Sequence, residues 1–84
     1  MQITKHAHQR MEQRGITRSM IDLVLEYGEM AQDKAVMDRR HALKLIQLLE
    51  NQLRTAKKIA DKGGCVVVEA DNAILTAYNC QSNH

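Results

Sequence analysis

The sequence of 84 residues contains no Trp, no Phe and no Pro, and only two Tyr. Proteins that bind single-stranded nucleic acid on a stacking platform hold successive bases against aromatic rings. Two rings are too few for such a platform. Any nucleic acid bound by this chain is therefore expected to be held mainly by charge and hydrogen bonds.

Cysteine is also scarce. Cys65 and Cys80 are the only two, and they lack the C-x-x-C spacing of redox and zinc sites. A two-residue turn at positions 71–72 would place Cys65 opposite Tyr78 on the next strand, with Cys80 as its diagonal neighbour at about 7 to 8 Å. That separation is beyond comfortable disulfide reach, so we expect two reduced thiols.

Long apolar runs are missing as well. No stretch approaches the roughly 20 residues that span a bilayer, and the first residues lack the apolar core of a secretion signal. We therefore expect a cytoplasmic protein of bacterial type that has no membrane partner.

Size and charge indicate a single small globular domain over residues 1–84. Hydrophobic residues make up 44% of the chain and charged residues 26%, a balance typical of folded proteins rather than disordered ones. The formal net charge is only +2, so the distribution of charge matters more than its total. Between Lys5 and Arg18 there are four basic residues against one acidic residue, Glu12, which concentrates positive charge near the N-terminus.

The spacing of apolar residues predicts three helices. The first runs over about 5–14 and ends at Gly15, and the second begins after Thr17 or Ser19 and ends before Gly28. Together they form a helical hairpin. The third and longest helix begins after Asp38 and continues to about residue 62, where two glycines end it.

Two β-hairpins complete the predicted fold. A short one occupies residues 29–38, with its turn at 32–34, and a longer one pairs 65–69 with 73–79. Strict alternation in the longer hairpin gives one wholly apolar face, which we expect to meet the long helix, and one half-polar face that carries Tyr78. The fold class is thus α+β, with the helical hairpin and the long helix packed on a small antiparallel sheet of about four strands. Residues 81–84 look like a frayed tail.

A cationic ridge on the first helix is the leading candidate for a working surface. His6, Arg10 and Arg14 recur every four residues and fall within about 80° of one another on a helix. Beside them an apolar stripe, Ile3, Ala7 and Met11, gives the helix a side for docking. The ridge is then expected to face outward or into a cleft.

Arg39 and Arg40 occupy the first turn of the long helix, where the helix dipole disfavours positive charge. An anion is one explanation for their position, because helix N-termini present free N–H groups to phosphates. An ion pair with an acidic residue elsewhere is the other.

Residues 4–16, TKHAHQRMEQRGI, resemble the opening signature T-x-H-A-x-x-R-M-x-x-R-G-I of a family of small bacterial and phage proteins described as a domain of unknown function. Weaker similarity extends through the second helix, residues 38–43 and residues 74–78. The family is similar in fold to RelE-type toxins, within the group of barnase, EndoU, colicin and RelE ribonucleases. The resemblance implies helices packed on an antiparallel sheet, and membership of presumed toxin–antitoxin modules or other mobile elements.

If the resemblance extends to activity, it implies RNA cleavage without metal or cofactor. His6 would transfer protons, while Arg10 and Arg14 would hold phosphate oxygens through bidentate contacts. Tyr78 would hydrogen-bond or stack on the nucleotide. Lys5, Arg39 and Arg40 are the further candidates for phosphate binding.

Each of these residues also has a structural explanation. His6 could hydrogen-bond near the helix start with Thr4, the two ridge arginines could pair with Glu12, Asp22 or Glu26, and Tyr78 could be a buried strand residue. Two functions consequently stay open. One is an RNA-directed, toxin-like protein, in its enzymatic form a metal-independent endoribonuclease, whose partners are RNA or the ribosome and a cognate antitoxin. The other is a non-catalytic phage or mobile-element inhibitor that binds a host protein or nucleoprotein complex, favoured because Asn79 stands where a basic residue is common in relatives.

Overall fold

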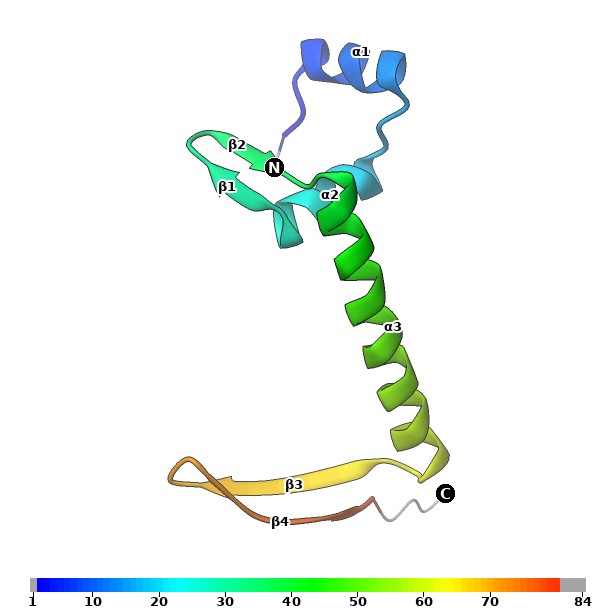
Figure 1. Cartoon of the computed structure of the whole chain (residues 1–84), viewed down its shortest axis with the longest axis vertical. Coiled ribbons are helices and arrows are strands. Elements are labelled where there is room, and N and C mark those ends of the chain that lie inside the picture. The colour runs from blue at the N-terminus through cyan, green and yellow to red at the C-terminus, as the bar shows by residue number, and fades with distance from the viewer. Residues whose placement is uncertain (1, 81–84) are drawn as a thin grey trace. The chain divides into compact units, whose positions relative to one another are not determined.

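The computed structural model describes residues 2–80 and confirms an α+β chain with three helices and four strands (Figure 1). In chain order the elements are α1 (Lys5–Arg14), α2 (Arg18–Tyr27), β1 (Glu29–Ala31), β2 (Lys34–Val36), α3 (Arg39–Asp61), β3 (Cys65–Ala70) and β4 (Ala73–Asn79). The strands form two separate antiparallel pairs, β1 with β2 and β3 with β4, in place of one continuous sheet. The predicted frayed tail, 81–84, lies outside the described residues.

The chain divides into two compact units, residues 1–45 and 46–84, and α3 runs through the boundary as one uninterrupted helix. The first unit contains α1, α2, the β1–β2 hairpin and the start of α3. The second contains the rest of α3 and the β3–β4 hairpin.

Local hydrogen bonds set the limits of α2. The hydroxyl of Thr17 accepts from the backbone N–H of Met20 at 3.2 Å, so Thr17 rather than Ser19 is the N-cap. At the other end, the N–H of Gly28 donates to the carbonyl of Val24 at 2.7 Å. A Cβ at Gly28 would lie 2.5 Å from that oxygen and 2.9 Å from the carbonyl oxygen of Val36, so only glycine lets α2 and β2 approach this closely.

The first unit holds the best-packed residues. Leu45, near the start of α3, is the one buried residue within 2–80, with 6% of its surface exposed. Ile21 and Val24 on α2 and Ala35 on β2 are half-buried, and α2 contacts β2. In the β1–β2 hairpin Ala31 pairs with Lys34, so the turn is shorter than predicted and Lys34 belongs to the strand.

The end of α3 and the turn of the last hairpin depend on positive backbone angles. Gly63 and Gly64 have φ of 81° and 107°, and their N–H groups donate to the carbonyls of Ala60 and Ile59 at 3.0 and 2.9 Å. Asp71 and Asn72 have φ of 52° and 63°, the geometry of the tight hairpin turn that the sequence predicts.

The register of the last hairpin differs from the predicted one. Ala70 pairs with Ala73 as predicted, but a β-bulge in β4 shifts the pairing between Val68 and Glu69, so Val66 rather than Cys65 lies opposite Tyr78. An extra residue in one strand turns all later side chains to the other face. Tyr78 therefore shares a face with Val66 and Val68, and its predicted place on the half-polar face is wrong.

The β3–β4 hairpin has little cover in the second unit. Val66 is half-buried, and the other residues of the two strands are exposed. The structure thus does not show the predicted packing of the long helix on this hairpin. Cys65 and Cys80 are free thiols, as predicted.

Candidate functional site

α1 forms because both of its ends are capped. The hydroxyl of Thr4 accepts a hydrogen bond from the N–H of Ala7 at 3.1 Å, which satisfies a free donor of the first turn. Gly15 ends the helix with φ of 66°, a left-handed conformation that glycine adopts without strain. The N–H of the next residue, Ile16, donates a hydrogen bond to the carbonyl of Met11 at 2.9 Å.

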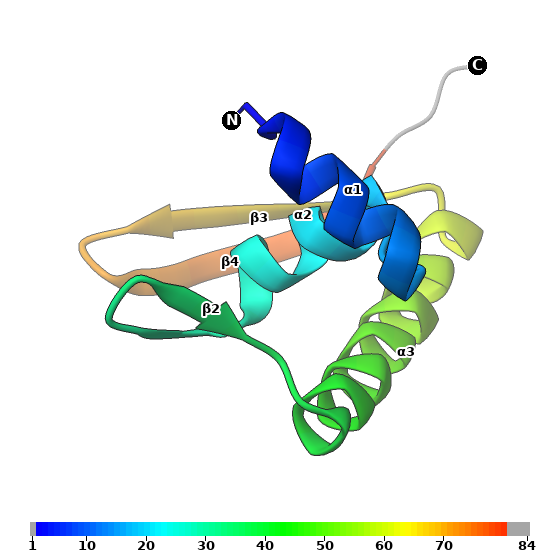
Figure 2. The ribbon, with the colours of Figure 1, turned by 90° about the horizontal axis from the view of Figure 1, so that it is seen from above.

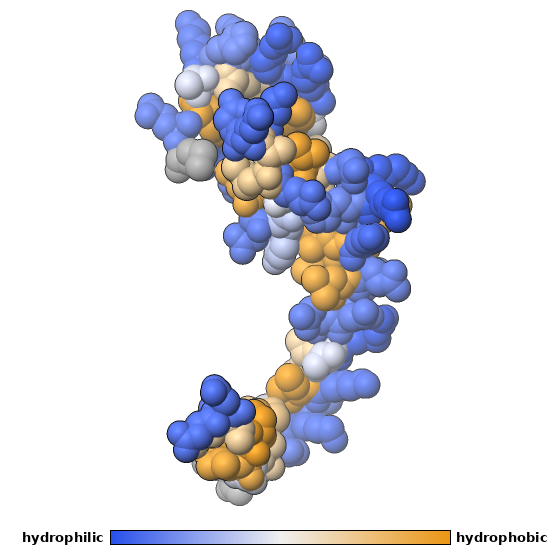
Figure 3. All heavy atoms as spheres, turned by 60° about the vertical axis from the view of Figure 1, so that its left-hand side comes forward, coloured by the Kyte–Doolittle hydropathy of each residue, from blue (hydrophilic) through white to orange (hydrophobic). Residues whose placement is uncertain are grey.

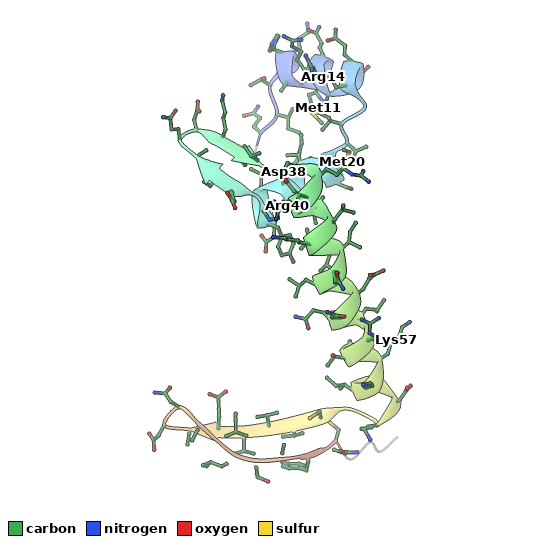
Figure 4. All side chains as sticks on the ribbon, in the orientation of Figure 1. Met11, Arg14, Met20, Asp38, Arg40 and Lys57 are labelled. Carbon is green, nitrogen blue, oxygen red and sulfur yellow. The ribbon has the colours of Figure 1, made fainter. Side chains whose placement is uncertain are left out.

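The two predicted stripes of α1 differ in burial. Ile3, Ala7 and Met11 are half-buried, whereas the side chains of the cationic ridge, His6, Arg10 and Arg14, are exposed. In two views α1 lies over α2 (Figures 1 and 2), and Met11 lies on the side of α1 that faces α2 (Figure 4). The first helix is docked through its apolar stripe, and its cationic ridge faces outward.

The structural explanations offered for the ridge are not realised within residues 2–80. The Thr4 hydroxyl is engaged by Ala7, and Asp22 pairs with Arg18 at 3.2 Å. In this part of the chain Arg10 and Arg14 make no ion pair. The cationic ridge is thus a row of three solvated groups, about 6 Å apart along the helix axis, available for an external anion.

A second polar feature lies at the start of α3. The carboxylate of Asp38 caps the helix by accepting from the N–H of His41 at 2.8 Å. Beside it is a hollow of about 510 Å³. The side chains that line it come from β1, β2 and the first turns of α3: Glu29, Val36, Asp38, Arg40, His41 and Lys44.

Arg40 is the one predicted phosphate-binding residue among the side chains that line this hollow, and Arg39 and Lys5 are exposed outside it. Lys44 and His41 were not among the residues predicted from the sequence. The i, i+4 spacing of Arg40 and Lys44 puts both cations on one side of α3, but that spacing alone does not indicate a hollow. Two carboxylates, however, balance the two cations in the hollow, so its charge does not by itself select an anion.

The predicted residues lie on three different elements, namely α1, the start of α3 and β4. The cationic ridge lies on α1 and Arg40 lines the hollow at the start of α3, with α2 between Arg14 and Arg40 in the view of Figure 4. Tyr78 is exposed on β4 in the second unit, so its proximity to the cationic ridge stays a prediction. Tyr78 is 53% exposed, so the alternative explanation that it is a buried strand residue does not hold.

Among residues 2–80 there is no group of three or more His, Cys, Asp or Glu side chains placed to hold a metal ion. Within the same range, none of the helices combines the length and the apolar character that a membrane crossing requires.

One comparison with known proteins gave a match. A family model described as a domain of unknown function (DUF4258) matches residues 3–79, which is nearly the whole chain. No curated protein and no solved structure matches the chain.

Proposed function

The chain belongs to the DUF4258 family, and we propose that it is an RNA-directed, toxin-like protein that holds RNA phosphates on the cationic ridge. The observation that carries this proposal is the state of His6, Arg10 and Arg14. They stand in one exposed row on a capped helix that is docked from its other side. These three side chains make no ion pair within the described residues, so the row is suited to binding an external polyanion.

The composition of the cationic ridge favours phosphate over a carboxylate-bearing protein. Guanidinium groups make bidentate contacts with carboxylates as well as with phosphates. A nucleic-acid strand, however, repeats its phosphates at regular intervals and so offers successive sites to a row of such groups. Because the chain has so few aromatic residues, phosphate contacts rather than base stacking would supply most of the affinity. Recognition of this kind is tolerant of sequence.

The enzymatic form of the proposal is a metal-independent endoribonuclease of a toxin–antitoxin module, with a RelE-like fold. His6 would take the proton of the 2′-hydroxyl, and Arg10 and Arg14 would stabilise the charge that develops on the phosphate. Tyr78 would contact the nucleotide. The protein would act in the cytoplasm, where its RNA substrates and the ribosome are.

The experiment measures binding of a fluorescent single-stranded RNA by anisotropy and cleavage of total RNA in the presence of EDTA. Arg14→Ala and His6→Ala are compared with Arg54→Ala, which removes a positive charge from a different helix, α3. We expect Arg14→Ala to weaken RNA binding while Arg54→Ala leaves it unchanged, and His6→Ala to abolish cleavage with binding retained. If the wild-type protein neither binds nor cuts RNA, the proposal fails.

A second candidate function, a non-catalytic inhibitor that binds a host protein, is favoured by a separate observation. An apolar hollow of about 400 Å³ lies in the first unit, lined by Ile16, Met20, Ile21, Val24, Leu25 and Ala35. Leu25 and Met20 are nearly half exposed, at 46% and 49%. Exposed apolar surface of this kind marks contact sites for other proteins.

Leu25→Glu separates the two functions, because it alters the apolar hollow and leaves the cationic ridge intact. If growth inhibition in a host is lost in Leu25→Glu and retained in Arg14→Ala, the inhibitor is correct. If it is lost only in Arg14→Ala, the RNA-directed function is correct. Circular dichroism of both variants confirms that the helices are retained.

A further inference from the structure

α3 carries an apolar stripe with the spacing of a coiled coil. Its members lie alternately four and three residues apart, as the core positions of a heptad repeat do: Ala42, Ile46, Leu49, Leu53, Ala56 and Ala60. The opposite side of the helix carries Lys44, Asn51 and Lys58. We call the six apolar residues the α3 seam.

The central part of the α3 seam is open to solvent. Ile46, Leu49 and Leu53 are 51%, 42% and 54% exposed, whereas neighbouring Leu45, which is not part of the seam, is only 6% exposed. In Figure 3 one side of α3 is hydrophobic and the other is hydrophilic. A helix side that faces solvent normally carries polar and charged residues. Three large aliphatic side chains in a row are therefore unusual on an exposed side.

The charges beside the α3 seam distinguish between possible arrangements of two such helices. Directly after the core residues Leu49 and Ala56 come Glu50 and Lys57, at the flanking positions that make interhelical ion pairs in coiled coils. Neither makes an ion pair within residues 2–80. In a parallel pair, Lys57 would lie beside Gln52 and no ion pair would form. In an antiparallel pair, Glu50 of one helix lies beside Lys57 of the other.

We propose that the α3 seam is a self-association surface, on which α3 of a second copy of this chain packs in antiparallel orientation. The twofold axis makes the contact isologous, so the Glu50–Lys57 pair forms twice, once on each side of the axis. In the register that joins these two residues, Leu53 of each copy packs against Ala56 of the other, and Leu49 packs against Ala60. Charge complementarity and heptad spacing thus select the same partner, another copy of the chain.

The contact is short, with four core positions of the α3 seam from each copy, Leu49 to Ala60. Coiled coils of about two heptads are marginal, because few apolar layers oppose the loss of freedom on association. We therefore expect a reversible dimer with a dissociation constant in the micromolar range. The dimer does not depend on the proposed RNA binding, since the cationic ridge lies on another helix, and Arg14→Ala is expected to leave it unchanged.

The test is sedimentation equilibrium of the full chain from about 5 μM to 500 μM, with far-UV circular dichroism to verify that each variant is helical. The variants are Glu50→Lys, Lys57→Glu and the two combined. Lys58→Glu is the matched control, because it makes the same charge change as Lys57→Glu one residue further on, on the side of α3 away from the seam. Each single reversal replaces two attractive contacts by two repulsive ones, so we expect each to raise the dissociation constant about tenfold.

We expect the combined variant to return to within about threefold of the wild type, because it restores both ion pairs with their signs exchanged, and Lys58→Glu to have no effect. A wild-type protein that is monomeric at every concentration would overturn the proposal, since the α3 seam would then not join two copies. Equal weakening by Lys57→Glu and Lys58→Glu, or failure of the combined variant to recover, would also overturn it, because the dimer would then use another surface or orientation.

Discussion

The carboxylate of Asp38 accepts a hydrogen bond from the backbone N–H of His41 at 2.8 Å, and this contact closes the N-terminus of α3. The same helix turn carries Arg39 and Arg40, whose charges oppose the helix dipole there. The cap therefore offsets a local electrostatic disadvantage as well as satisfying a backbone donor.

We expect Asp38→Ala to lower the free energy of unfolding by about 1 kcal/mol, the usual effect of losing an N-cap. Asp38→Asn keeps an oxygen acceptor and should recover most of that loss. Asp33→Ala, in the turn between β1 and β2, is the control for removing a carboxylate. Urea denaturation followed by circular dichroism measures all three, and an unfolding free energy for Asp38→Ala equal to that of Asp33→Ala would contradict the capping role.

Gly28 should tolerate substitution less well than Gly15, although its backbone angles are ordinary. A Cβ at Gly28 meets two carbonyl oxygens at 2.5 and 2.9 Å, and both belong to the backbone, which cannot move without shifting α2 or β2. At Gly15 a Cβ meets nothing within 4 Å, and only the positive φ opposes it.

We therefore expect Gly28→Ala to cost about 1–3 kcal/mol of unfolding free energy, as overpacking does. Gly15→Ala should cost about 1 kcal/mol, and Gly15→Asn less, because asparagine adopts the left-handed conformation more readily. Thermal or urea denaturation gives the order. A Gly28→Ala protein as stable as the wild type would show that α2 and β2 do not approach as closely as described.

Salt dependence tests how the cationic ridge binds. Each cation that contacts a phosphate releases counterions, so the logarithm of the binding constant falls linearly with the logarithm of the salt concentration. Arg14→Ala should lower the magnitude of that slope by about 1 for a single-stranded RNA, while Arg54→Ala should not change it. The measurement is fluorescence anisotropy at four or five KCl concentrations, and equal slopes for the wild type and Arg14→Ala would remove Arg14 from the interface.

Both thiols should react readily in the native protein. Cys65 and Cys80 are exposed, and Cys65 lies opposite Asn79 in the ladder. The N–H of Cys80 donates to the carbonyl of Gly64 at 3.3 Å, so Cys80 is opposite the residue before Cys65 and its side chain leaves the hairpin on the other face.

We expect Ellman's reagent to count two thiols without denaturant, and mild oxidation to yield disulfide-linked dimers rather than a loop within one chain. Non-reducing electrophoresis and intact mass of the oxidised protein provide the measurement. The Cys80→Ser variant isolates Cys65 as a control. A monomer two mass units lighter after oxidation would be inconsistent with side chains on opposite faces.

The turn at Asp71 and Asn72 could be predicted from the sequence, whereas the β4 bulge could not. Asp71 and Asn72 adopt left-handed angles readily, so the turn and its first pair, Ala70 with Ala73, were predictable. The bulge at Leu75, three residues after Asn72, has no comparable signal. Alternation alone therefore assigned Tyr78 to the wrong face.

The candidate site likewise has features that follow from spacing along the chain and features that do not. The outward cationic ridge and the docked stripe on α1 follow from helical spacing, and both agree with the observed burial. The hollow at the start of α3 does not follow from spacing, because its lining comes from two strands and a helix brought together by packing. His41 and Lys44 were missed for this reason.

The sequence by itself determined what depends on neighbours along the chain. Hydrogen bonds and backbone angles within a few residues set the limits of the helices. They include the caps at Thr4, Thr17 and Asp38 and the glycines that end the helices. Only the tertiary structure decided the bulge register of β4, the need for glycine at position 28 and the side chains that line the two hollows. Those features arise from contacts between segments that are distant in the sequence, and the energy of such contacts is not encoded in any one segment.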